Sequence, residues 1–573
     1  MILQNYDYVD GKLEDAVKKN SEMITDDKSR WFYKKWRGLM RNSGHTSRME
    51  SRLEEHMRRC KGIYRRMYET GMSPYPTRVP FTEYKRQMVQ NGDDTLMEIL
   101  RRLPKGGLLH VHSAAALSAD GLIVLLEDFM SNDELPTIYI ETAGNEAGKM
   151  SYKATASGTQ ITLQAFYESY PNRIGAEQKL KEWMTVGAHT NQNPYIWDEF
   201  NKIFMRTSDL FANETFYYEY HTRFFVECMV DRIDYVELRC GFQEFVGDEN
   251  QKQANVVLDQ SPKFLDLLMA ARDEAVTQYQ HNDALHDWKL PFDGMGLGVI
   301  LCARRDLDTG SGQDRDRLMK KIDAAIVWKL GPYSKLIKGF DFVSEEDRGK
   351  ASYTYYRDIY YGTALTGYTD PALQAAAASL MKTYNPDAFV RVKMIELMLH
   401  AGESLWMEQE NIIDAKEASR LRVGHGFQML AYPGAMGKYI VGNMTGMPCG
   451  PVLEVCPISN QMLRYFPDIR NHYALMLMKL GIPCVLANDD PQILENQGLS
   501  YDFWEIYMAS EGGLMLMKGL VFTAFLFHCQ HRYGKPLYMW EEDEYEMSLM
   551  EFQKYYWEPF LEEMSRYFEE PED

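Results

Sequence analysis

Short apolar runs alternate along most of the chain with longer segments of helical periodicity. Eight apolar runs predict buried strands, at residues 108–112, 233–239, 296–301, 337–343, 394–399, 421–423, 452–456 and 484–487. Helical patterns lie between these runs in the second half of the chain. Eight β-α units are the number found in a TIM barrel, so we predict an α/β fold of that class.

The segments around the predicted barrel differ in character. Because 573 residues are too many for one ordinary domain, additions to the barrel are expected. Residues 1–90 are rich in helix formers and charge, which predicts a helical N-terminal extension and a candidate dimerisation arm. Residues 91–510 would form the barrel, with an insertion at about 128–193 after the first strand. Residues 511–573 are expected to form helices and an acidic tail.

The charge balance limits the kinds of partner. A formal net charge of −20 argues against general binding of nucleic acid backbones. The basic, aromatic stretch 28–66 is compatible with a nucleotide or nucleic-acid surface. A helical packing or dimer arm with a solvated face agrees better with the acidic whole. We therefore expect no nucleic acid partner.

The cysteines and the apolar segments indicate a cellular compartment. Eight cysteines make no dense disulfide framework in a chain of this length, and no CxxC pair is present. The first residues are polar and acidic, unlike a signal peptide. The apolar stretch 514–527 contains Lys518 and is too short for a membrane span. A cytoplasmic protein without a membrane partner is the expectation.

Four polar clusters follow predicted strands. Side chains two apart on a strand share a face, so His110 and His112 can approach one ion. Three histidines and one aspartate form a plausible zinc site that leaves room for a water. Taken singly, a histidine after a strand is usually a satisfied core group, and paired aspartates often cap helices. The clusters are HVH at 110–112, HAGE at 400–403, GHG at 424–426 and NDDP at 488–491.

These clusters and their surroundings resemble the adenosine/AMP deaminase superfamily, most closely its adenosine deaminase growth factor branch. The resemblance spans roughly residues 90 to 510, and the run EVCPISNQ together with HAGE and DDP is its most specific part. The motifs are LPKGGLLHVH (103–112), NQN followed by Trp (191–197), YVELR (235–239), KGFDFVSEED (338–347), LHAGES (399–404), RVGHGF (422–427), EVCPISNQML (454–463), DIRNH (468–472) and NDDP (488–491).

The resemblance implies hydrolytic deamination of an adenine nucleoside or its 5′-monophosphate, by attack of a metal-activated water on purine C6. Glu403 would give a proton to purine N1, and His425 would orient or deprotonate the water. Asp490 would hydrogen-bond N7. One ion per chain, usually zinc in this family, would be held by His110, His112, His400 and Asp489.

Two positions near the sugar depart from nucleoside deaminases. Ser113 stands where an aspartate commonly binds the 5′-hydroxyl, and Arg304 stands where the growth factor branch has a histidine. Losing a carboxylate and gaining a guanidinium is the change that a 5′-phosphate requires, so AMP or dAMP is a candidate substrate. The alternative is that Arg304 and Arg305 face solvent or pair with Asp306 and Asp308.

Two further positions concern the purine and the ribose. Ser344 replaces a glycine whose backbone N–H reaches purine N3 in the relatives. Trp197 matches an aromatic residue that the relatives use near the ribose, although core packing explains it equally well.

Two other classes of function stay open. One is another metal-dependent hydrolase of the amidohydrolase type on the same barrel, and the other is a catalytically silent relative that only binds. Related proteins dimerise through an N-terminal extension, so a homodimer or higher homo-oligomer is expected. The pattern does not distinguish nucleoside from nucleotide, ribose from deoxyribose, or salvage from defence.

Overall fold

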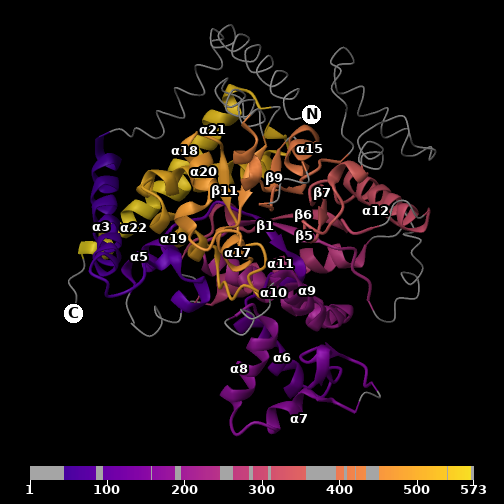
Figure 1. Ribbon diagram of the computed structural model, residues 1–573. Coiled ribbons are helices and arrows are strands. Elements are labelled where there is room, and N and C mark those ends of the chain that lie inside the picture. The colour runs from indigo at the N-terminus through magenta and orange to yellow at the C-terminus, as the bar shows by residue number, and fades with distance from the viewer. Residues whose placement is uncertain are drawn as a thin grey trace, which may run out of the picture.

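The computed structural model describes most of the chain and places eight parallel strands at its centre (Figure 1). The described residues are 44–85, 94–155, 158–187, 195–245, 262–282, 285, 288–307, 312–355, 395–405, 410–419, 421–433, 451–537 and 540–569. The strands are β1 (Leu108–His112), β5 (Tyr235–Cys240), β6 (Gly296–Arg304), β7 (Ile337–Val343), β8 (His400–Ala401), β9 (Arg422–His425), β10 (Val452–Val455) and β11 (Cys484–Leu486).

The strands close into a barrel. They form two four-stranded sheets, in the orders β1-β5-β6-β7 and β11-β10-β9-β8. Parallel bridges join the two sheets at both edges, between Val111 and Asp489 and between Phe340 and Leu397. Every strand pair in the ring is parallel. The TIM-barrel prediction is therefore confirmed, and the carboxyl ends of all strands meet at one mouth.

One predicted strand differs from the structure. The apolar run 394–399 was expected to be a strand, but residue 394 lies outside the described residues and β8 contains only His400 and Ala401. Residues 396–398 still pair with β7, because the Phe340 N–H donates to the Glu396 carbonyl at 2.8 Å and the Met398 N–H donates to the Phe340 carbonyl at 3.0 Å. The backbone N–H of His400 instead donates to Asp341 Oδ1 at 2.8 Å. A polar side chain thus ends the pairing with β7 where the candidate site begins.

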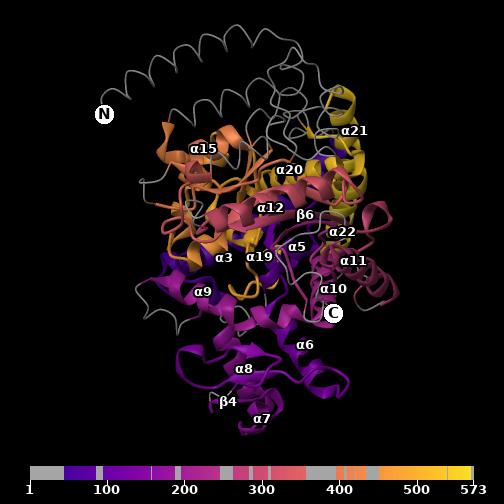
Figure 2. The same ribbon diagram turned by 90° about the vertical axis from the view of Figure 1, so that its right-hand side faces the viewer.

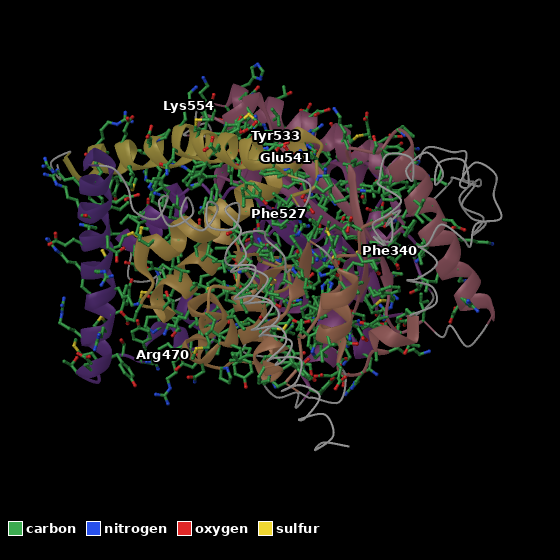
Figure 3. All side chains as sticks on the ribbon, turned by 90° about the horizontal axis from the view of Figure 1, so that it is seen from above. Phe340, Arg470, Phe527, Tyr533, Glu541 and Lys554 are labelled. Atoms are coloured by element: carbon green, nitrogen blue, oxygen red, sulfur yellow. The ribbon has the colours of Figure 1, made fainter. Side chains whose placement is uncertain are left out.

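Helices surround the barrel (Figures 1 and 2). They include α10 (Glu214–Val230), α11 (Lys263–His281), α12 (Gly312–Leu330), α15 (Asn411–Ala418), α17 (Pro457–Met462), α18 (Tyr473–Lys479) and α19 (Leu499–Ala509). Their apolar faces and the strands share one buried core. In Figure 3, Phe340 and Phe527 lie inside this core, whereas Arg470 and Lys554 lie at the periphery.

The segment after β1 forms a lobe that projects from the barrel (Figure 1). It contains α6 (Ala119–Ser131), α7 (Leu163–Glu168), α8 (Arg173–Met184) and the short strands β2 (Tyr139–Glu141), β3 (Met150–Ser151) and β4 (Gln160–Thr162). The strands are antiparallel, in the order β3-β2-β4. Helix α9 (Ile196–Thr207) then returns the chain to the barrel, while residues 188–194, which include the expected NQN motif, lie outside the described residues.

The two ends of the described chain pack together at one side of the barrel. Helix α3 (Gly44–Glu69) is followed by α5 (Thr95–Arg102), and the C-terminal part forms α20 (Gly513–Tyr533), α21 (Glu542–Phe552), a π-helical turn (Gln553–Trp557) and α22 (Glu558–Glu569). Helix α3 lies beside α22 and α20 (Figure 1). The Lys518 ammonium donates to Glu50 Oε1 at 2.9 Å, which ties α20 to α3.

Helix α20 is long and apolar enough to cross a membrane by length and composition alone. In the structure, however, 72% of its most apolar window is buried inside the protein. Its buried face packs on α3 and β11. This is the environment of a core helix.

Candidate active site

Three imidazoles and one carboxylate converge at the mouth of the barrel. His110 and His112 come from β1, His400 comes from β8, and Asp489 follows β11. Asp489 Oδ1 lies 3.3 Å from His110 Nε2 and 3.2 Å from His112 Nε2. The Nε2 atoms of His112 and His400 are 3.2 Å apart. The structure thus brings all four predicted metal ligands together.

The spacing and chemistry of this cluster fit a divalent metal ion. A four-coordinate ion with bonds of about 2.0–2.1 Å separates its ligand atoms by roughly 3.3 Å, close to the distances in the cluster. His110 Nε2 is buried and has no hydrogen-bond partner among the described residues, so its lone pair is available. Imidazole nitrogens with one carboxylate oxygen form a donor set that suits zinc.

His425 lies near the same cluster but in a different relation to it. One candidate metal group comprises His110, His400, His425 and Asp489, with ligand atoms within 4.8 Å of one another. His425 Nε2 is 3.9 Å from Asp489 Oδ2 and 3.5 Å from Glu403 Oε2. His112 makes the shorter contacts, so the geometry favours His112 as the ligand and leaves His425 facing Glu403.

Buried carboxylates orient two of the ligand histidines. His110 Nδ1 donates to Glu454 Oε2 at 2.8 Å, and His400 Nδ1 donates to Asp341 Oδ2 at 2.6 Å. A carboxylate only accepts, so each ring carries its proton on Nδ1 and presents the Nε2 lone pair to the cluster. Arg239 joins the two carboxylates, at 2.8 Å from Asp341 and 2.6 Å from Glu454.

The two carboxylates that orient these histidines, Asp341 and Glu454, stay ionised. Burial alone would raise the pKa of Asp341, but its contacts with His400 and Arg239 lower that pKa below the usual range. Burial likewise opposes ionisation of Glu454, and the guanidinium groups of Arg239 and Arg422 lower its pKa well below normal. Asp341, Glu454 and Arg239 were not among the site residues expected from the sequence. Charged residues inside otherwise apolar strands are the signal that indicates them.

Glu403 has the environment of a proton donor. The carboxylate of Glu346 accepts from the backbone N–H groups of Gly402 at 3.0 Å and Glu403 at 2.6 Å, which fixes the turn after β8. The Glu403 side chain is buried, with only 4% of the residue exposed. Burial, followed by the nearby charges of Asp489 and Glu346, raises the pKa of Glu403 well above its usual value. Burial thus favours the protonated form of this carboxyl group.

His425 has the environment of a proton acceptor. Burial lowers the pKa of His425 well below its usual value, although the charge of Asp489 opposes this effect. The backbone at His425 has a φ of 58°, and Gly426 follows with a φ of 70°. Such left-handed conformations are strained outside glycine, and here they turn the neutral imidazole toward the cluster.

The paired aspartates after β11 face different surroundings. Ser459 donates to Asp489 Oδ2 at 2.8 Å, which leaves Oδ1 toward the histidines. Asp490 is buried, and its Oδ1 has no hydrogen-bond partner among the described residues. A buried carboxyl oxygen beside the cluster is available to a polar ligand.

Two of the predicted sugar-side residues are bound within the protein. Ser113 lies 2.8 Å from His221 Nε2, and His221 Nδ1 donates to the carbonyl of Tyr217 at 2.7 Å. The second ring nitrogen of His221 is thus an acceptor, and the Ser113 hydroxyl donates to it. Trp197 is 8% exposed and donates to the Tyr465 hydroxyl at 3.0 Å.

Of the two arginines at the end of β6, only Arg304 follows the alternative outlined from the sequence. Arg304 is 61% exposed at its side chain and pairs with Asp306 at 2.7 Å. Arg305 is buried and donates from Nη2 to the carbonyl of His400 at 2.6 Å, so it supports β8. Its Nε and Nη1 have no hydrogen-bond partner among the described residues. Ser344 has a φ of 99°, so it adopts a conformation that favours glycine.

The barrel and the ligand cluster suit a metal-dependent hydrolase, and the sequence is similar to known enzymes. No family model matches the chain. Adenosine deaminase 2 from Sus scrofa is 24% identical over 518 residues, covering 86% of this chain and 88% of the relative. Adenosine deaminase 2 from Homo sapiens is 25% identical over 437 residues, covering 73% and 72%.

Among solved structures, adenine deaminase from Arthrobacter aurescens matches with a TM-score of 0.46 and 14% identity, covering 79% of this chain and 98% of that one. The predicted resemblance is thus confirmed as a sequence similarity to proteins named adenosine deaminase 2 over most of the chain.

Proposed function

We propose that the protein is a zinc-dependent hydrolase that deaminates an adenine nucleoside or its 5′-monophosphate to the inosine form. The observation that carries the proposal is the contact of Glu403 Oε2 with His425 Nε2 at 3.5 Å beside the ligand cluster, where burial raises the pKa of Glu403 and lowers the pKa of His425. The relatives named adenosine deaminase support the choice of adenine as the base.

The chain's own residues account for the proton transfers. His110, His112, His400 and Asp489 would hold the ion, which when bound makes a water nucleophilic at neutral pH. His425 takes a proton from the attacking water as its oxygen bonds to C6. Glu403 gives its proton to N1, so no negative charge builds up on the ring. N6 then receives the proton held by His425, and the C6–N6 bond breaks as ammonia leaves. The C6 hydroxyl returns its proton to Glu403 as the C6 carbonyl forms.

Asp490 provides a polar contact for the purine. Its carboxyl group is buried next to Asp489, and burial followed by the charge of Asp489 raises its pKa well above the usual value. The protonated carboxyl group, whose Oδ1 has no partner among the described residues, can donate to N7, which only accepts. Of the two neighbouring carboxyl groups, Asp489 would then bind the ion and Asp490 would bind the base. This arrangement favours a purine over a smaller ring that lacks N7.

We propose the free nucleoside as the preferred form of the substrate. Arg304 is the residue that a 5′-phosphate was expected to recruit, and its charge is already balanced by Asp306. Acidic side chains also follow Ser344 at the same mouth, namely Glu345, Glu346 and Asp347. Among the described residues, this environment repels a phosphate rather than attracting it.

A substrate panel tests both the proposed deamination and the proposed preference for the free nucleoside. The purified protein is offered adenosine, deoxyadenosine, AMP and dAMP, and ammonia release is measured. Release from the nucleosides supports the proposal, and an Arg304→Ala variant should then behave as wild type. Turnover of AMP that Arg304→Ala abolishes would restore the phosphate hypothesis. Absence of ammonia from all four compounds would refute deamination and favour another amidohydrolase reaction or a binding role.

We also propose a homodimer and a cytoplasmic location. Exposed apolar side chains at α3 and just after it, Ile63 and Met72 at 51% and 75% exposure, support an interface there. The seven described cysteines are free thiols, which agrees with a reducing compartment. Light scattering should give about twice the chain mass of 66.6 kDa, and a monomer at micromolar concentration would contradict the dimer.

A further inference from the structure

Two of the sequence motifs, EVCPISNQ and DIRNH, contribute polar residues that the proposed reaction has not yet used. They are Asn460 on α17 and His472 at the start of α18. Both are buried, at 0% and 2% exposure. A buried amide and a buried imidazole are costly unless hydrogen bonds satisfy them, so their partners are informative.

A backbone hydrogen bond sets the protonation of His472. The backbone N–H of Ala474 donates to His472 Nδ1 at 3.0 Å, as part of the N-terminal cap of α18. A ring nitrogen that accepts carries no proton, so the proton of the neutral ring sits on Nε2. Burial lowers the pKa of His472 to about 3, which keeps the ring neutral. Phe427 and Phe466 pack around the ring and hold its orientation.

The next hydrogen bond orients the amide of Asn460. His472 Nε2 lies 3.0 Å from Asn460 Oδ1. Since Nε2 is the donor, the carbonyl end of the amide faces His472 and the amino end faces away. Asn460 Nδ2 then donates to Glu403 Oε1 at 3.3 Å. The chain of donors runs in one direction, from the cap of α18 to the carboxyl group of Glu403.

We infer that Asn460 and His472 are positioning residues that determine which oxygen of Glu403 carries the acidic proton. Because Oε1 accepts from Asn460, the proton of the neutral carboxyl belongs on Oε2. Oε2 is the oxygen that faces His425, at 3.5 Å from its Nε2. The proton is thereby held on the side of the reaction point, where purine N1 must receive it. This inference rests on the proposed deamination.

The first test reverses the donor at Asn460. Asn460→Asp keeps the shape of the side chain but turns the donor into an acceptor, which draws the Glu403 proton to Oε1. With adenosine as substrate, kcat should fall by about 10²-fold or more, the size of a general-acid contribution. Asn460→Ala removes the donor without reversing it, so its loss of kcat should be smaller. KM and the zinc content should stay close to wild type in both variants.

The second test changes the donor at His472. Glutamine can offer an amide N–H near the position of Nε2, whereas leucine cannot. His472→Gln should therefore retain at least tenfold more kcat than His472→Leu. His528→Leu is the matched control: this buried histidine on α20 stacks on Tyr235, away from Glu403. Its kcat per folded molecule should equal that of wild type.

Three results would overturn the inference while leaving deamination intact. One is a kcat within twofold of wild type for Asn460→Asp. The second is equal loss for His472→Gln and His472→Leu, and the third is a loss of zinc in Asn460→Asp that matches its loss of activity. If wild type releases no ammonia from adenosine, AMP or their deoxy forms, the proposed function fails and the inference fails with it.

Discussion

Glu403 shows how one residue acquires a chemical role from its surroundings. Its carboxyl group is buried among other carboxyls, so its pKa is raised and it keeps a proton that an exposed glutamate would lose. Among the described residues, Glu403 makes no hydrogen bond to any of the four predicted metal ligands, whereas Asn460 donates to it directly. Proton transfer and metal binding are thus assigned to different side chains.

Glu403→Gln separates these two roles. Glutamine preserves the shape and the acceptor for Asn460 but cannot give up a proton, so kcat should fall by about 10²–10⁴-fold. Zinc content, measured by elemental analysis, should remain that of wild type. A variant that loses its zinc together with its activity would show that Glu403 supports the ion instead.

Ser344 illustrates strain at a single residue. Its φ of 99° costs a residue with a Cβ atom free energy that glycine avoids. We expect Ser344→Gly to raise the free energy of unfolding by about 1 kcal/mol, as measured by urea denaturation. A lower free energy of unfolding would mean that the serine side chain makes a stabilising contact. Activity on adenosine should persist, because the backbone N–H is retained.

At the scale of elements, parallel strands bring the ligands together. The carboxyl ends of β1, β8 and β11 meet at one mouth, so residues that are hundreds of positions apart come within bonding distance of one ion. Below the mouth, the guanidinium of Arg239 on β5 forms ion pairs with both Asp341 and Glu454. Strands β1 and β8 and the turn after β11 contribute ligands, and β7 and β10 contribute the carboxylates that orient two of them.

The carboxylates that orient the ligand histidines, Asp341 and Glu454, give a prediction about metal affinity. Asp341→Asn removes the acceptor that fixes the His400 ring, so zinc affinity should fall by about 10–100-fold in a competition with a chelator. Asp234→Asn is the control, because this buried aspartate bonds to Tyr556 at the opposite end of β5. Equal zinc affinity in Asp341→Asn and wild type would show that the Asp341 carboxylate does not support metal binding.

The elements also show what the sequence could and could not predict. Apolar runs located seven of the strands, because parallel strands are buried on both faces. The run before His400 pairs with β7 only around Leu397. The next bond goes from the His400 N–H to the side chain of Asp341, and no local pattern reveals a distant side chain. Spacing indicated the ligand histidines, but the pairing of Arg304 with Asp306 and the direction of the Asn460 amide depend on three-dimensional placement.

At the scale of the whole molecule, the two described ends stabilise the barrel from one side. Glu50 on α3 receives hydrogen bonds from Lys518 on α20 and from the indole of Trp557. Glu50→Ala would leave a buried ammonium without its carboxylate. We expect a loss of about 3 kcal/mol in the free energy of unfolding, measured by denaturant titration. A change below about 0.5 kcal/mol would show that α3 is peripheral to stability.

The buried neutral histidines give the molecule a pH dependence. Burial lowers the pKa of His221 to about 4 and that of His472 to about 3, both below the ordinary value of 6.5. As the pH decreases, the unfolded chain therefore binds protons at these rings at a higher pH than the folded protein does. The contribution of these rings to the free energy of unfolding is fully present above pH 6.5. It falls as the pH decreases toward 4, by up to about 1.4 kcal/mol per pH unit for each ring. Unfolding titrations at pH 7 and pH 5 should show this loss, and equal stability would contradict it.

The measurement that tests the central claim most directly is ammonia release from adenosine before and after removal of the metal. The account predicts steady release by protein that carries one zinc per chain, loss of release after treatment with a chelator, and recovery when one equivalent of zinc is restored. Deamination that continues unchanged in metal-free protein, or no ammonia from the zinc-loaded protein, would contradict it.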